Sequence, residues 1–159
     1  MAEPSMTGMF NQALDLLADI ISESAAFRTW YDAADAAAAK AMIQFYEFED
    51  DDLARPRVLL DTTEMSGSGS APQFRVHQEF IVIFEVDVPE TYEDSTRQAI
   101  KDFMNNCGAA MAQILARPPE ELRIASWRKI HGPARSDKRE RAGSSGDDYI
   151  QAIFTIGAA

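Results

Sequence analysis

Apolar residues recur at the three-and-four spacing of a half-buried helix in two parts of the chain. The first stripe begins at Met9 and consists of Phe10, Ala13, Leu14, Leu17, Ile20 and Ile21. The second runs from Ile100 to Leu115, after the potential caps Asp94 and Ser95 and before a pair of prolines. The alanine-rich segment 29–42 predicts a further helix. We therefore expect N-terminal helices within residues 8–42 and a long helix over 94–116.

Alternation of apolar and polar residues along most of its length predicts a strand over residues 74–88. One face carries Phe74, Val76, Phe80, Val82, Phe84, Val86 and Val88, and the other carries Arg75, His77, Glu79, Glu85 and Asp87. We expect the first face to be buried and the second to be mostly solvated. Shorter β-prone runs lie at 43–48, after Pro56, at 122–131 and at 149–156. The Gly/Ser-rich stretch 65–72 predicts a flexible hairpin loop.

These elements predict a single domain over residues 1–159 of the α+β class, with a mainly antiparallel sheet of about four strands packed against two or three helices. Strands and the Gly/Ser loop occupy 56–88. A C-terminal hairpin with a long polar loop occupies 122–157. The helices are expected to cover the apolar face of the sheet.

Composition is that of a folded chain, with 46% hydrophobic and 26% charged residues. No run of residues is long and apolar enough to span a bilayer, and the N-terminus lacks the features of a signal peptide. We therefore expect a protein made in the cytoplasm that does not enter a membrane. Cys107 is the only cysteine, which excludes an intrachain disulfide.

The residues that could support catalysis or metal binding do not form a recognisable pattern. Cys107 lies on the apolar helix stripe and is predicted to be inert core, and neither His77 nor His131 has the spacing of a metal ligand. The acidic run 47–52 lacks the glycine and spacing of a calcium loop, so we interpret it as a solvated turn. The sequence thus predicts no catalytic residue, cofactor or metal, and a protein that is not an enzyme.

Charge is distributed unevenly along the chain. The net charge is −11, and residues 1–54 contain eleven acids against two bases. Between 128 and 141, by contrast, lies a basic segment that contains our candidate interaction residues Arg128, Lys129, Arg135, Lys138, Arg139 and Arg141. This basic segment could be a solvated loop, contact an acidic surface on a neighbouring subunit, or contact nucleic acid phosphates.

The subunit contact fits the charge layout better than nucleic acid does. Asp137 and Glu140 dilute the positive charge, and the loop has no aromatic residue on which bases could stack. A basic segment at one end and acids at the other favour head-to-tail association, which closes into a ring when the rotation permits. Nucleic acid binding by residues 128–141 is kept as the alternative function.

The order of elements resembles the small tail-terminator and head-to-tail joining proteins of tailed bacteriophages and prophages. The resemblance is carried by AAFRTWYDAADAAAAKAMIQFY, the acidic linker with ARPRVLL, the Gly/Ser loop, the long strand ending VDVPE, a helix, and DDYIQAIFTIG. It implies a mixed α/β domain and a structural role, with hexameric rings that cap the tail tube and join the head. The expected partners are further copies of the chain, the tail tube and head-completion proteins, and the expected location is the virion.

Overall fold

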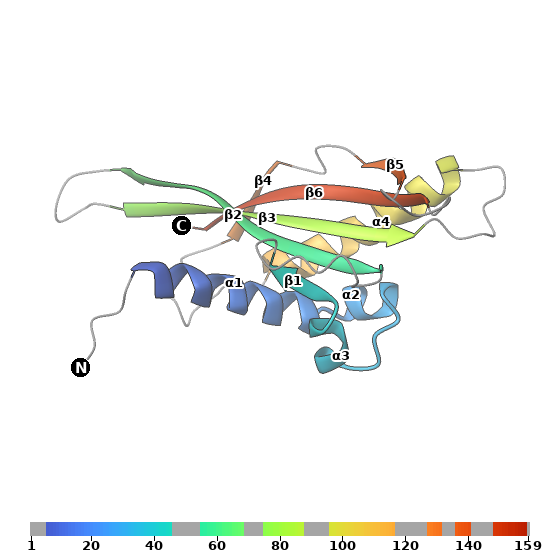
Figure 1. Cartoon of the computed structure of the whole chain (residues 1–159), viewed down its shortest axis with the longest axis horizontal. Coiled ribbons are helices and arrows are strands. Elements are labelled where there is room, and N and C mark those ends of the chain that lie inside the picture. The colour runs from blue at the N-terminus through green and yellow to red at the C-terminus, as the bar shows by residue number, and fades with distance from the viewer. Residues whose placement is uncertain are drawn as a thin grey trace.

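The computed structural model describes residues 6–45, 55–68, 75–87, 96–116, 127–131, 136–140 and 148–158. Four helices pack against one face of a twisted sheet (Figure 1). The helices are α1 (Met6–Glu23), α2 (Ala25–Trp30), α3 (Ala36–Lys40) and α4 (Thr96–Ala116). The strands are β1 (Ile43–Phe45), β2 (Arg57–Ser68), β3 (Arg75–Asp87), β4 (Trp127–His131), β5 (Ser136–Glu140) and β6 (Asp148–Ala158).

The sheet has the order β1-β2-β3-β6-β4, and β5 pairs with β6 as well. β1 runs parallel to β2, and every other pairing is antiparallel. The α+β class and the mainly antiparallel sheet are therefore confirmed. The described residues contain six strands and four helices, more than the four strands and two or three helices we predicted.

The core lies between the sheet and the helices. Phe80, Val82 and Phe84 of β3 are fully buried there, as the alternation predicted. They meet the apolar stripes of α1 and α4, which contribute Ala13, Leu14, Leu17, Ala18, Ile20, Ile21, Phe103, Cys107, Ala110, Met111 and Ile114. Burial of this many large apolar side chains is the main force holding the two layers together.

The predicted helix over 29–42 is two short helices instead. Asp32 adopts a left-handed conformation (φ 53°), and two hydrogen bonds close the end of α2, from Ala33 N to the carbonyl of Arg28 and from Asp32 N to the carbonyl of Thr29. This pairing is the Schellman arrangement that ends helices. Asp35 then caps α3 by accepting a hydrogen bond from Ala38 N. The sequence pattern missed this break because an aspartate occupies the position where glycine is usual.

Two predicted loops also contain strand. β2 continues to Ser68, so residues 65–68 of the predicted Gly/Ser loop pair with residues 75–78 of β3. Residues 136–140, predicted as part of a polar loop, form β5 along β6. β4 also pairs antiparallel with β6. No helix in the described ranges has both the length and the apolarity needed to cross a bilayer.

Candidate interaction surface

A basic edge is formed by the two strands that flank β6 on the side away from β3. β4 places Arg128 opposite Gly157 and Lys129 opposite Ile156. β5 places Lys138 opposite Ile150 and Arg139 opposite Tyr149. Lys129 is exposed. Since Ile150 and Ile156 are six residues apart on β6, the two basic pairs are separated by about 20 Å along this edge.

Four of the six candidate residues thus have a defined place in the fold. The side chains of Arg128, Lys138 and Arg139 are not among those described, although their backbone positions are. Arg135 and Arg141 lie outside the described residues. The structure therefore places the four candidate residues that lie on β4 and β5 at one edge of the sheet. They are spread along this edge and do not form a single cluster.

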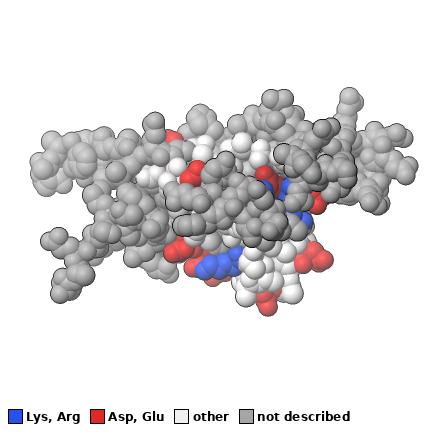
Figure 2. Space-filling view, viewed as in Figure 1, with Lys and Arg blue, Asp and Glu red and all other residues white. Residues whose placement is uncertain are grey.

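An acidic surface is formed by the N-terminal helices. Asp15 and Glu23 of α1 are exposed, as are Asp32 and Asp35 around the start of α3. Asp19 pairs with Lys40 of α3 at 2.6 Å, with about half of each side chain exposed. This hydrogen bond raises the pKa of Lys40. Figure 2 shows acidic side chains along the margin of the molecule where α1 and α3 lie.

The basic edge and the acidic surface lie on opposite sides of the molecule. In Figure 1, β4 and β5 lie above β6, whereas α1 and α3 lie below the sheet. β4 is also the last strand in the sheet order, at the edge opposite β1, which follows α3 in the chain. Two copies related by a head-to-tail rotation would therefore bring surfaces of opposite charge together.

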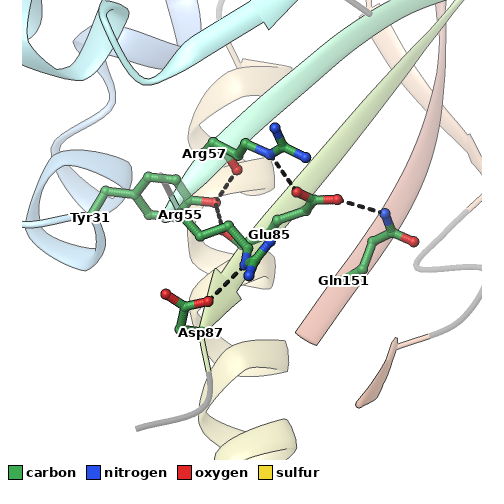
Figure 3. A network of polar contacts seen from close by, with 6 residues as sticks. All are labelled: Tyr31, Arg55, Arg57, Glu85, Asp87 and Gln151. Carbon is green, nitrogen blue, oxygen red and sulfur yellow. Dashed lines mark hydrogen bonds and ion pairs between the residues drawn. The ribbon is translucent and has the colours of Figure 1, made fainter. Parts of the chain in front are cut away.

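The face of the sheet opposite the helices carries a polar network that the sequence pattern did not reveal (Figure 3). Arg57 of β2 pairs with Glu85 of β3, Nε to Oε2, at 2.6 Å. Gln151 of β6 donates from Nε2 to Glu85 Oε1 at 2.9 Å. These three residues are direct cross-strand neighbours. Glu85, predicted to be on a solvated face, is only 3% exposed and lies between these two neighbours in a row across three strands.

A second polar row lies next to the first, toward the end of the sheet. Arg55 Nε donates to Asp87 Oδ1 at 2.7 Å, and the Arg55 guanidinium lies 4.3 Å from the centre of the Tyr149 ring. Asp87 is paired in register with Tyr149. Here the prediction of a solvated carboxylate is correct, since the Asp87 side chain is 53% exposed. The two rows tie β2, β3 and β6 together by charge as well as by backbone pairing.

Tyr31, at the end of α2, reaches the same strands from the helical side. Its hydroxyl lies 3.0 Å from the carbonyl oxygen of Arg57 and 3.3 Å from that of Glu85 (Figure 3). Burial raises the pKa of Tyr31 well above its ordinary value. The hydroxyl therefore stays protonated and acts as a hydrogen-bond donor to the main chain.

The remaining reactive residues that the structure describes do not gather into a site. Cys107 is 1% exposed, as predicted for a core position, and burial raises the pKa of its thiol, which disfavours the reactive thiolate. The side chains of His77 and His131 are not described, and the acidic run 47–52 lies outside the described residues. Within the described part of the chain, no three His, Cys, Asp or Glu side chains come together as metal ligands would.

In comparisons with known proteins, no family model and no curated protein sequence matches this chain.

Proposed function

We propose that this protein is a structural subunit of a tailed bacteriophage or prophage, which assembles into a ring at the end of the tail tube and joins the tail to the head. One observation supports assembly into a ring. The basic edge of β4 and β5 and the acidic surface of α1 and α3 lie on opposite sides of one domain. A heterologous contact between them is repeated by each added copy and closes into a ring when the rotation permits. The family resemblance implies a ring of six members.

The phage context is supported by the order of elements. The resemblance rests on N-terminal helices, an acidic linker, a long strand, one long helix and a closing hairpin, and this order agrees with the arrangement of α1 to β6. On this proposal the partners are further copies of the chain, the tail tube and head-completion proteins. The protein is made in the bacterial cytoplasm, becomes part of the virion and catalyses no reaction.

Charge-reversal variants test the contact. Lys138→Glu with Arg139→Glu should abolish the oligomer by placing like charges opposite the acidic surface. Asp15→Lys with Glu23→Lys, on exposed positions of α1, should do the same. Mixing the two double variants should restore assembly, because each then offers a surface complementary to the other. Lys101→Glu, at an exposed position of α4, is the matched control and should assemble normally.

Light scattering coupled to size exclusion, at low and moderate salt, reads out the mass, and negative-stain images show whether rings form. A strict monomer at high concentration in both salts would contradict the proposal, as would variants that all behave like the control. DNA binding that weakens steeply with salt and is lost on changing Lys138 and Arg139 to alanine would favour the nucleic acid alternative instead.

A further inference from the structure

The hairpin of β2 and β3 continues past the strands that flank it. β6 pairs with β3 no further than Gln78, opposite Ala158, and β1 pairs only with the first part of β2, opposite Val58, Leu59 and Leu60. From Gln78 outward, residues 65–68 pair with residues 75–78, and residues 75–77 lie beyond the pairing with β6. We call residues 65–68 and 75–77 the β2–β3 arm. Among the described strands it is a two-stranded ribbon, which projects past β6 in Figure 1.

A β-bulge marks the base of the arm. Thr62 is opposite Phe80 and Met65 is opposite Gln78, so β2 has one residue more than β3 between these pairs. A bulge of this kind bends the strand and increases its twist. The bulge lies next to the point where β6 stops pairing with β3. The bend in the β2 backbone therefore falls where the arm leaves the sheet.

Beyond the bulge, the β2 edge of the arm lacks two of the features that normally prevent strand addition. Edge strands are usually protected by charged side chains or proline, and residues 65–68 (Met-Ser-Gly-Ser) contain neither. β4 and β5, which form the opposite edge of the sheet, carry Arg128, Lys129, Lys138 and Arg139. A ribbon of only two strands, one of them Met-Ser-Gly-Ser, is also weakly stable unless further strands join it.

We propose that the β2 edge of the arm pairs antiparallel with the same edge of a second copy, forming a four-stranded ribbon across a twofold axis. The uncharged stretch 65–68 can lie opposite itself without bringing like charges together. Each copy carries a net charge of −11, so two copies repel each other where their acidic surfaces meet. The projecting arm lets two copies meet while the acidic surfaces of α1 and α3 stay apart. Such a contact is isologous and closes at two copies, so it is independent of the proposed ring.

Single cysteines test the symmetry of this pairing. Met65, Ser66, Gly67 and Ser68 are each changed to cysteine in the full chain, where the native Cys107 is buried and stays unreactive. In an antiparallel pair across a twofold axis, a position near the axis faces its own counterpart, so at least one variant should form a disulfide-linked dimer under mild oxidation. Ala109→Cys and Ala112→Cys, at exposed positions of α4, are controls that should stay unlinked.

A charged edge should break the same contact. Ser66→Lys with Ser68→Lys should halve the mass measured by light scattering, whether the wild type is a dimer or a pair of rings. Ala109→Lys with Ala112→Lys carries the same added charge and should leave the mass unchanged.

Three results would each overturn the proposal: no arm cysteine crosslinks above the α4 controls, the lysine variant keeps the wild-type mass, or the wild type is monomeric at all concentrations. The charge-reversal variants of β5 separate this inference from the proposed function. They should dissolve the ring yet leave the arm crosslink intact.

Discussion

Arg57 and Glu85 form a buried ion pair of 2.6 Å between directly opposed residues of β2 and β3. The Arg57 side chain is 9% exposed and that of Glu85 is 4% exposed. Charges removed from water to this degree are tolerated only when they are paired and hydrogen-bonded, and Gln151 supplies a further hydrogen bond to Glu85. One carboxylate therefore links side chains from three strands.

Replacement of Glu85 by glutamine should strongly destabilise the fold. It removes the negative charge that balances Arg57 and should lower the free energy of unfolding by about 3–5 kcal/mol. The double change Arg57→Leu with Glu85→Leu should recover most of that loss, because both buried charges are removed together. Asp87→Asn, in the more exposed pair, should cost about 1 kcal/mol or less. Urea denaturation of the four proteins would measure these differences, and a Glu85→Gln cost no larger than that of Asp87→Asn would contradict the argument.

The junction between α2 and α4 offers a second test. Ser24 caps α2 by accepting a hydrogen bond from Phe27 N, and its hydroxyl donates to Gln113 Oε1 at 2.6 Å. The same oxygen of Gln113 accepts from Ala26 N at 3.1 Å. Ser24→Ala and Gln113→Ala should each cost about 1 kcal/mol. Because the two residues share a bond, the double variant should cost less than the sum, and strict additivity in a double-mutant cycle would count against the contact.

Glycine in place of Asp32 should stabilise the protein. Asp32 has a positive φ of 53° at the end of α2, a conformation that costs an L-residue about 1–2 kcal/mol and costs glycine little. After the added entropy of glycine in the unfolded chain, a net gain of about 0.5–1 kcal/mol remains. Asp35→Gly, at the extended cap of α3, is the matched control and should give no gain. Thermal and urea unfolding would show both effects.

Stability should fall in alkaline solution. The ordinary pKa values are 9.0 for Cys107 and 10.0 for Tyr31, and both are raised in the folded protein, chiefly by burial. Above these ordinary values the unfolded chain loses protons that the folded chain retains, so the free energy of unfolding decreases as pH rises. Each group contributes a slope of up to about 1.4 kcal/mol per pH unit. The raised pKa of Lys40 acts in the same direction above 10.5.

Unfolding measured between pH 7 and pH 11 under reducing conditions should show this decline. Cys107→Ala should flatten the slope just above pH 9, and Tyr31→Phe should flatten it above pH 10. If the free energy of unfolding of both variants fell with pH as steeply as that of the wild type, neither Cys107 nor Tyr31 would stay protonated in the folded state.

The sequence pattern predicted those elements whose burial is regular. α1, α4 and the buried face of β3 follow from spacing alone, because a helix or strand with one apolar side must cover that side. β5 has the sequence Ser-Asp-Lys-Arg-Glu, which has little intrinsic strand preference. It is a strand because β6 lies beside it, and that neighbour is not visible in the local sequence.

The candidate surface was only partly predictable for a related reason. Charge counts identified the basic segment and the acidic half, and the fold places described members of each on opposite sides of the domain. The row of Arg57, Glu85 and Gln151 depends on the register of three strands that are far apart in the sequence. Alternation shows which residues share a face of one strand, but not which residues of other strands they meet.

Tyr31 couples the end of α2 to the pairing of β2 with β3. Its hydroxyl bonds the main chain of the same two residues whose side chains pair on the far side of the sheet. Fraying of β2 from β3 at this end would have to detach the last turn of α2 at the same moment. This end of the sheet should therefore open as one cooperative unit, with its amide hydrogens exchanging together rather than one strand at a time.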